Sequence, residues 1–147
     1  MSRGEERQPA TSTPHELINP ESLPVPTGFS HAVVARPGRQ VFVAGQIATG
    51  ADGSVVTGSI DSQFELAAAN VVSALEAAGA EPEHLVSLLI FVTDVPEYRD
   101  ASREIGAAYR RHFGRHFPAM ALFGIGALFD PEAKVELVAT AVVPESA

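Results

Sequence analysis

The sequence predicts an α+β fold in which one mixed β-sheet carries two helices on one of its faces. Several segments alternate apolar and polar residues with the period of a strand, and two others repeat apolar residues with the period of a helix. The predicted order along the chain is β-β-β-α-β-α-β-β, which suits a single layered domain. A length of 147 residues is enough for one domain with one sizeable core.

The N-terminal part is expected to hold a tail and two strands. Residues 1–17 are rich in Pro, Ser, Thr and charge, which predicts a disordered tail, and a single domain is expected over 18–147. A first strand is predicted at 29–34. A second is predicted at 40–47, where successive side chains alternate between the two faces of a strand.

A hairpin and the first helix are expected next. The Asp-Gly pair at 52–53 predicts a tight turn, and a short strand near 54–57 would close the hairpin. Apolar residues then recur at helical spacing. Asp61 or Ser62 is suited to cap the start of this helix, and Gly79 is suited to end it.

The C-terminal half is expected to alternate strand and helix. Residues 85–93 form an apolar run that predicts a buried strand, and a helix is expected over 98–113, ended by Gly114. Residues 117–129 contain no charge and predict another core strand. The last strand is expected at 134–142, where apolar and polar side chains alternate.

The second face of the sheet is expected to be apolar and exposed. With both helices on one face, the other would present Phe42, Ala44, Val138 and part of 117–129. An exposed apolar sheet face of that size usually marks an interface. We therefore expect a homo-oligomer that buries these faces against one another, with closed symmetry.

The composition excludes several classes of function. The chain has no cysteine, which excludes disulfides, thiolate metal sites and a cysteine nucleophile. A net charge of −8 argues against nucleic-acid binding. No apolar run approaches the roughly 18 residues of a membrane span, and the N-terminus shows no secretory signal. We expect a cytoplasmic protein without a membrane partner.

Histidines are the side chains that could carry acid–base or metal chemistry. His31 lies in the first predicted strand and could act as an acid or base, although a structural or exposed histidine is the commoner case. His112 and His116 are four residues apart, but Gly114 between them should end the helix, and no third ligand is evident. We expect surface histidines there and no metal site.

Four segments resemble one known family. They are AGQI at 44–47, ALEAAGAEPEHLV at 74–86, VTDV at 92–95 and FPA at 117–119. Over 18–143 the sequence resembles the Rid family of reactive-intermediate deaminases, also called YjgF-like or L-PSP endoribonuclease-like proteins.

The resemblance implies a chorismate-mutase-like subunit in a homotrimer, with the sheets facing inward and the helices outward. It implies small-molecule clefts between neighbouring subunits, in which typical members hydrolyse 2-imino or 2-enamino acids to 2-keto acids and ammonia. It implies neither a metal nor an organic cofactor. The charge of −8 conflicts with the ribonuclease activity in the older family name.

The resemblance also assigns positions in the cleft, most of which lack the polar group that the family uses. Met120 stands where the family has a carboxylate-binding arginine, and Val138 where it has a glutamate that helps to activate water. Phe29, Ala44 and Gly106 replace a tyrosine, a serine and an asparagine. Gly45 and Gln46 match the family. The full set of expected pocket residues is Phe29, Ala44, Gly45, Gln46, Gly106, Met120, Leu122 and Val138.

Such a cleft predicts a neutral or apolar ligand, because methionine cannot replace the two charge-assisted hydrogen bonds of a guanidinium. His31 and Glu136 are the candidates for assisting water or moving a proton. Two hypotheses stay open. The first is a divergent deaminase-like hydrolase that acts on an imine, enamine or related neutral metabolite. The second is a non-catalytic trimer that binds a small molecule or serves as a scaffold.

Overall fold

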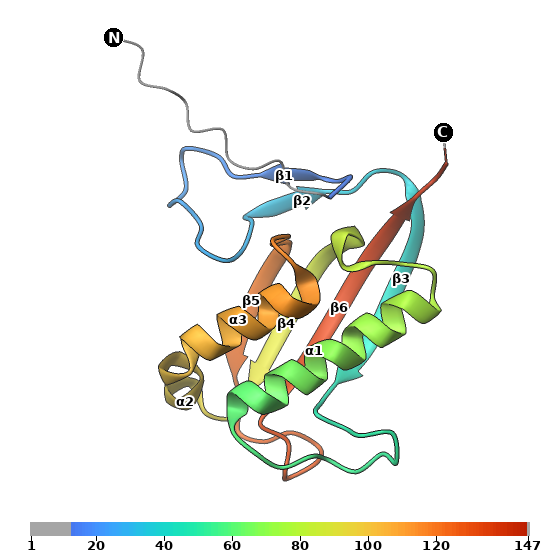
Figure 1. Cartoon of the computed structure of the whole chain (residues 1–147). Coiled ribbons are helices and arrows are strands. Elements are labelled where there is room, and N and C mark those ends of the chain that lie inside the picture. Colours follow the sequence, from blue (N-terminus) through green and yellow to red (C-terminus); the bar gives the residue numbers. More distant parts are fainter. Residues whose placement is uncertain (1–12, 147) are drawn as a thin grey trace.

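The chain forms a four-stranded mixed sheet, seen in a computed structural model that describes residues 13–146 (Figure 1). The spatial order of its strands is β3-β6-β4-β5, and β4 and β5 are parallel whereas the other neighbours are antiparallel. The predicted mixed sheet of an α+β fold is confirmed. The strands are β3 (Gly38–Gln46), β4 (Leu85–Val92), β5 (Ala119–Gly124) and β6 (Val135–Pro144).

The helices pack on one face of this sheet, as Figure 1 shows. The long α1 and α3 lie side by side across the strands, and the short α2 precedes α3. This arrangement agrees with the prediction of helices on a single face. The helices are α1 (Ile60–Ala77), α2 (Val95–Asp100) and α3 (Ser102–Phe113), with a 3₁₀ turn at Pro82–His84 before β4.

Two helices stand where one was predicted over 98–113. The first of them, α2, starts earlier because the Asp94 carboxylate accepts the backbone N–H of Glu97 at 2.9 Å. The division falls at Ala101, which ends α2 and precedes α3. Gly114 has a φ of 70° and ends α3 as expected.

The start of α1 is capped by Ser59, and the predicted caps Asp61 and Ser62 lie inside the helix. Ser59 has an extended backbone, with φ −68° and ψ 158°, and its Oγ accepts the backbone N–H of Ser62. A cap needs this non-helical geometry, which neither of the two later residues has. At the other end Gly79 follows the last turn with a φ of 76°, as expected for a C-terminal glycine.

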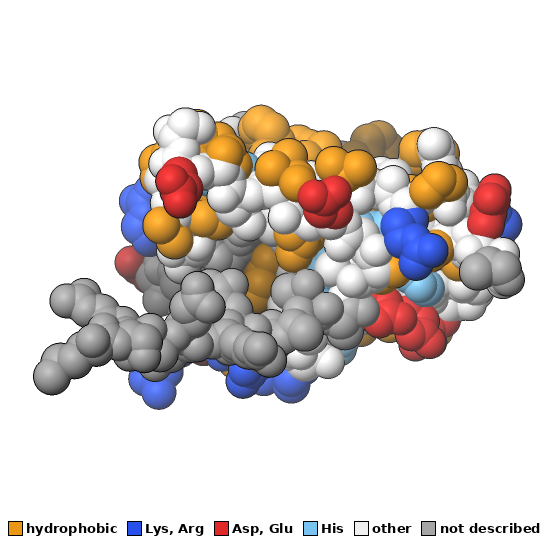
Figure 2. Space-filling view, turned by 90° about the horizontal axis from the view of Figure 1, so that it is seen from above, with side chains coloured by type: hydrophobic (Ala, Val, Ile, Leu, Met, Phe, Trp, Pro, Cys, Tyr) orange, Lys and Arg blue, Asp and Glu red, His pale blue; other side chains and the backbone are white. Residues whose placement is uncertain are grey.

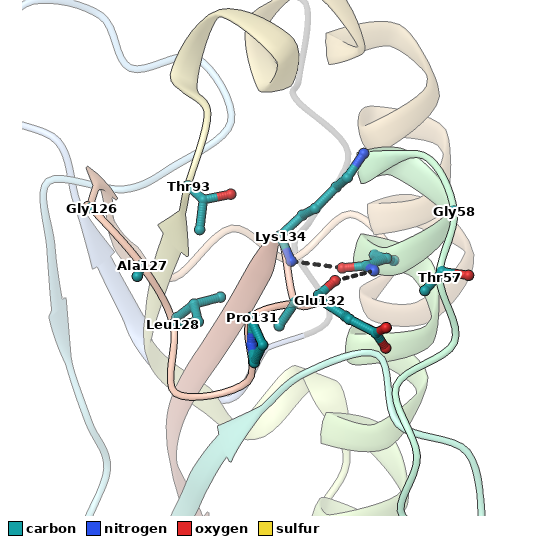
Figure 3. A pocket seen from close by; sticks show the side chains of 11 residues that line it. Thr57, Gly58, Thr93, Gly126, Ala127, Leu128, Pro131, Glu132 and Lys134 are labelled. Atoms are coloured by element: carbon teal, nitrogen blue, oxygen red, sulfur yellow. Dashed lines mark hydrogen bonds between the residues drawn. The ribbon is translucent and has the colours of Figure 1, made fainter.

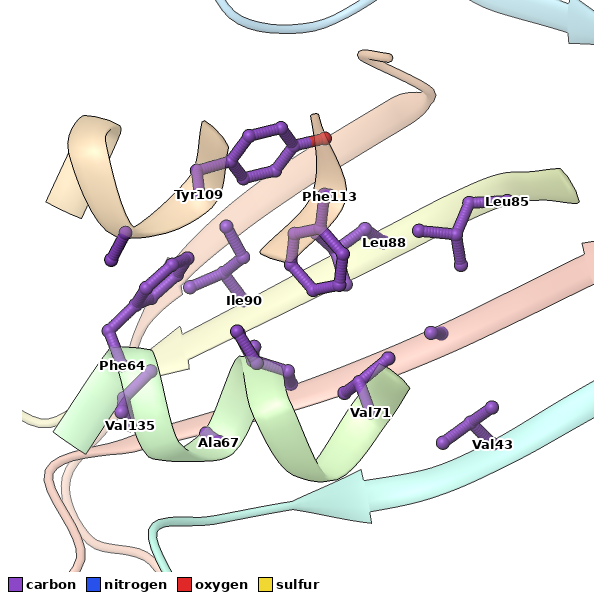
Figure 4. Close-up of a cluster of buried hydrophobic side chains, with 14 of the residues drawn as sticks. Val43, Phe64, Ala67, Val71, Leu85, Leu88, Ile90, Tyr109, Phe113 and Val135 are labelled. Carbon is purple, nitrogen blue, oxygen red and sulfur yellow. The ribbon is translucent and has the colours of Figure 1, made fainter. Parts of the chain in front are cut away.

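The core lies between the helices and the sheet (Figure 4). Alternate residues of β4 and β6 point into it, so that Leu88, Ile90 and Val135 lie in one buried cluster with Phe64 of α1. This alternation is the strand period that the sequence predicted.

A two-stranded ribbon lies beyond one end of the main sheet (Figure 1). It pairs β1 (Glu16–Ile18) with β2 (Ala32–Val34). The expected tail of residues 1–17 therefore overlaps with a strand, and the strand predicted at 29–34 is shorter. His15 accounts for the earlier start, since its buried Nε2 faces the Val142 carbonyl at 2.9 Å. The rest of the predicted tail, residues 1–12, lies outside the described residues.

Two predicted strands differ from the expectation. The strand predicted near 54–57 is reduced to a bridge, and the strand predicted within 117–129 is shorter. The hairpin strand near 54–57 forms only the bridge Thr49↔Val55, since the chain enters α1 a few residues later. Of 117–129, only β5 lies in the sheet. The neighbouring β4 ends at Val92, whose carbonyl accepts the N–H of Ile125, and beyond this bond the chain has no strand to pair with.

The second face of the sheet is apolar and exposed, and we call it the open face. Phe42 is 73% exposed and Phe123 is 44% exposed, and Phe123 stacks on Phe91 with ring centroids 5.3 Å apart. Hydrophobic side chains also spread along one edge of the molecule in the view of Figure 2, between single acidic side chains. The open face comprises Phe42, Ser87, Leu89, Phe91, Ala119, Ala121, Phe123, Glu136, Val138 and Thr140.

Candidate functional site

A pocket lies at the edge of the sheet, between β5, α3 and the segment before β2. Ser30 holds this segment in place, because its N–H donates to the Pro118 carbonyl at 3.0 Å and its Oγ to the Phe117 carbonyl at 2.6 Å. Phe29 is thereby brought beside Met120 and Leu122. We call this the edge pocket. It consists of two adjoining hollows of about 460 and 310 Å³ that share Gly28, Ile90, Tyr98 and Met120.

The larger hollow is lined mainly by apolar and aromatic side chains. Phe64, Ile105 and Phe117 line it together with Met120, and Gly106 lies on the α3 side. Four of the expected pocket residues are therefore gathered at this edge. They are Phe29, Gly106, Met120 and Leu122.

Two tyrosines, Tyr98 and Tyr109, line the edge pocket. Burial raises the pKa of Tyr98 to about 12. Burial also raises the pKa of Tyr109, with a smaller contribution from Tyr98. Both phenols are protonated at neutral pH. The Tyr109 hydroxyl donates to the His116 carbonyl at 2.6 Å and lies 3.9 Å from the Met120 sulfur, so its position is fixed.

A second group of expected residues lies away from the edge pocket, on β3 and β6. Glu136 places its carboxylate over Gly45, where a Cβ on residue 45 would overlap with Glu136 Oε1. A glycine is therefore required for this placement. Glu136 is half-buried, and among residues 13–146 it forms no ion pair. Ala44 is exposed next to Gly45, and Val138 lies two residues beyond Glu136 on the open face.

The structure does not bring the two groups together within one chain. β3 and β5 are the opposite edges of the sheet, with β6 and β4 between them. Gln46, at the end of β3, belongs to the second group, and its side chain donates to the Ala44 carbonyl at 3.0 Å.

His31 lies in neither group. Its Nε2 faces the Pro24 carbonyl at 2.7 Å, its backbone N–H donates to Asn19 Oδ1 at 2.9 Å, and its ring meets Phe29 edge-on at 5.1 Å. These contacts order the segment that carries Phe29. The predicted acid–base candidate is not among the residues that line the edge pocket of its own chain.

Sequence analysis did not find Tyr98, Ser102 or Arg110, which also line the edge pocket. A signal for Tyr98 and Ser102 was present, because they precede Ile105 and Tyr109 at spacings of four, three and four residues, which is the period of one helical face. Arg110 is not part of this run.

A separate hollow of about 470 Å³ lies where β4 ends and β6 begins (Figure 3). The buried Gln63 spans its base, donating to the Glu132 carbonyl at 3.0 Å and accepting the Lys134 N–H at 2.8 Å. The Lys134 Nζ is bound to the Glu97 carboxylate at 2.9 Å. None of the residues predicted for a site lines this hollow, and its lysine is occupied by the ion pair with Glu97.

Within residues 13–146, no three histidine, aspartate or glutamate side chains lie close enough to hold a metal ion. In the same part of the chain, no helix is long and apolar enough to cross a membrane.

The fold and the edge pocket define a class: a small α+β protein with a largely apolar pocket beside the outermost parallel strand. The profile of the family described as Endoribonuclease L-PSP matches residues 21–143. The chain therefore belongs to this family, which is also known as the Rid or YjgF family.

Relatives match over most of their length. The DfrA protein of Myxococcus xanthus is 32% identical over 129 residues, which cover 86% of this chain and 95% of that protein. A protein of Dermatophagoides farinae named 2-iminobutanoate/2-iminopropanoate deaminase is 29% identical over 136 residues, covering 89% and 98%.

Solved structures share the fold. The Rid-family protein YyfB of Yersinia pestis superposes with a TM-score of 0.77 at 33% identity, covering 88% of this chain and 98% of that one. A Mycobacterium tuberculosis protein of the YjgF/YER057c/UK114 family gives a TM-score of 0.58 at 34% identity, covering 79% and 87%.

Proposed function

We propose that the protein processes an imine or enamine-type metabolite whose reacting end is neutral, by hydrolysis, in a cleft between subunits. Three points support the proposal: the family, the deaminase name of one relative, and an edge pocket with an apolar lining. Small-molecule sites are commonly built in this way, from apolar walls and a few polar groups.

The observation that carries the proposal is that Met120 occupies the wall shared by both hollows of the edge pocket. A carboxylate against Met120 would lose water without gaining a charged partner. Removing one partner of such a buried pair costs about 2–5 kcal/mol. That corresponds to roughly 30-fold to several-thousand-fold weaker binding. A 2-imino acid is therefore a poor substrate if its carboxylate must face Met120.

A trimer would supply the missing base from a neighbouring subunit. The edge pocket contains no carboxylate, whereas the open face presents Glu136 without an ion pair among residues 13–146. Packing the open faces inward would set Glu136 of one subunit near the edge pocket of the next. Glu136 would then accept a proton from the water that attacks the imine carbon and return it to the nitrogen. The carbon–nitrogen bond of the resulting carbinolamine would break, which leaves a carbonyl product and releases ammonia.

The test compares the hydrolysis of two freshly generated compounds. One is a 2-imino acid, and the other is the imine that differs from it only in having hydrogen in place of the carboxyl group. An arginine-bearing relative serves as reference. We expect this protein to accelerate only the neutral imine. Glu136→Gln should slow that reaction by about 10²–10⁴-fold. Glu132→Gln, which changes an exposed glutamate in a loop, should leave the rate unchanged. Comparable rates with the imino acid would refute the substrate assignment.

A second candidate is a trimer that binds a small molecule without turning it over. It is favoured by the lining of the edge pocket, which within residues 13–146 includes hydroxyl-bearing residues and one arginine but no carboxylate or histidine. This candidate predicts that a neutral imine analogue raises the melting temperature while no product forms.

A further inference from the structure

One charged side chain lines the edge pocket. Of the described residues that form its two hollows, Arg110 alone carries a charge, and it belongs to the larger one. The other lining residues are apolar, aromatic, glycine or hydroxyl-bearing. A lone guanidinium beside such a lining, in a chain with a net charge of −8, is a position suited to an anionic group of a ligand.

Gly106 makes room for this side chain. Arg110 follows Gly106 by one helical turn of α3, and its Nη1 lies 3.5 Å from the place that a Cβ on residue 106 would take. The guanidinium therefore lies over a part of the helix surface that has no side chain. A longer side chain at position 106 would compete for the same space, as the asparagine expected at this position from the family resemblance would.

Arg110 has no acidic partner among residues 13–146. Its neighbour Arg111 differs, because Nε and Nη2 of Arg111 hold the Glu65 carboxylate with two hydrogen bonds of 2.9 Å. On the same helix, the guanidinium of Arg111 is therefore occupied by a carboxylate, whereas the five N–H donors of Arg110 remain available to a ligand.

We propose that the ligand of the edge pocket is an apolar compound with one carboxylate, and that Arg110 binds this carboxylate at the mouth of the larger hollow. The apolar body would contact Phe64, Ile105 and Met120. This inference rests on the proposed function and extends it: the reacting end is neutral, and the acid group lies at the far end of the molecule. Arg110 would set specificity, without a part in the chemical step.

The experiment measures binding of 3-phenylpropanoate and of its uncharged amide, 3-phenylpropanamide, by calorimetry at low salt. The wild-type protein should bind the acid more tightly than the amide. In Arg110→Gln the affinity for the acid should fall about tenfold or more, as expected for hydrogen bonds to a charged group, and the affinity for the amide should not change. Arg110→Lys should bind the acid with intermediate affinity, because lysine keeps the positive charge but cannot form the two parallel hydrogen bonds of a guanidinium.

Arg103→Gln is the matched control, since Arg103 is an exposed arginine of the same helix that does not line the edge pocket. It should leave both affinities unchanged. If the acid preference survives in Arg110→Gln, or falls equally in Arg103→Gln, the role of Arg110 is refuted. If the wild type binds the amide and the acid with equal affinity, the role of Arg110 fails, but the edge pocket remains a binding site for neutral ligands. If neither compound binds, the pocket of the proposed function fails too.

Discussion

His116 is fully buried just after α3, and its ring is held by one hydrogen bond. Its Nε2 donates to the Leu85 carbonyl at 2.7 Å, whereas Nδ1 has no partner among the described residues. Burial lowers the pKa of His116, and His15 and His84 add to this effect, while the Leu85 carbonyl and Glu83 oppose it. The neutral ring is therefore the form that the fold accommodates.

This lowered pKa predicts acid sensitivity. Below about pH 6.5 the unfolded chain binds a proton at His116 and the folded protein does not, until the pH reaches the lower pKa of the folded state. The free energy of unfolding should therefore decrease as the pH is lowered through this window. This group contributes at most about 1.4 kcal/mol per pH unit to the decrease. His116→Gln keeps a donor and does not titrate, so its profile should be flatter.

Urea midpoints at pH 7, 6 and 5 measure this difference, because the other titrating groups are common to both proteins and cancel. Parallel profiles would show that His116 does not carry the acid sensitivity.

The sequence indicated a surface histidine at this position. Spacing around Gly114 predicts where the helix ends, but the depth of residue 116 depends on the return of the chain against β4, which is a tertiary contact.

At the scale of the element, the start of α1 depends on one side chain. The sequence predicted Asp61 or Ser62 as the cap, whereas the cap is Ser59, a residue of equally suitable type that precedes both. The choice of Ser59 follows from its extended backbone, set by the turn before it, and not from residue type. The residue pattern therefore predicted the helix, but its first residue could be identified only from the backbone conformation.

Ser59→Ala tests this cap. The change removes the acceptor for the Ser62 N–H, and it should lower the free energy of unfolding by about 1 kcal/mol, as N-cap replacements usually do. Ser73→Ala is the control, because Ser73 is exposed within α1 and alanine is the better helix former there. Denaturant midpoints compare the two variants. An equal effect of both would contradict the capping role of Ser59.

The elements also explain why the candidate site was only partly predictable. The strand and helix patterns placed Met120 on β5 and Gly106 on the second helix, and the structure brings both to the edge pocket. Phe29 reaches the same pocket through the hydrogen bonds of Ser30, which no periodic pattern reveals. Arg110 was not predicted for the site, because the hollow that it lines forms only when α3 packs with β4, β5 and the segment before β2.

At the scale of the whole molecule, the open face determines the assembly that we propose. Its apolar side chains cannot be buried within one chain, since both long helices lie on the opposite face (Figure 1). The sequence could predict this imbalance because strand alternation assigned apolar residues to both faces. It could not predict the symmetry of the assembly, which depends on the shape of the face, and the trimer comes from the family resemblance alone.

Phe42→Asp tests the proposed assembly. Phe42 is 73% exposed on β3, and burying such a side chain stabilises an interface by about 1.5–3 kcal/mol. Replacing it by a charge would also bury a carboxylate without a partner. We expect the trimer to dissociate at least tenfold more readily, as seen by sedimentation velocity over a range of concentrations. Phe129→Asp is the matched control, because Phe129 is fully exposed in the loop after β5 and off the sheet.

A trimer that persists in Phe42→Asp would place the interface elsewhere, and a wild-type monomer would refute the assembly. The same samples connect the assembly to the site. If Glu136 serves the edge pocket of the neighbouring subunit, hydrolysis of the neutral imine must disappear in proportion to the loss of trimer. Binding of 3-phenylpropanoate at Arg110 uses residues of one chain and should survive dissociation. Loss of both in the monomer would mean that a neighbour also completes the pocket around Arg110.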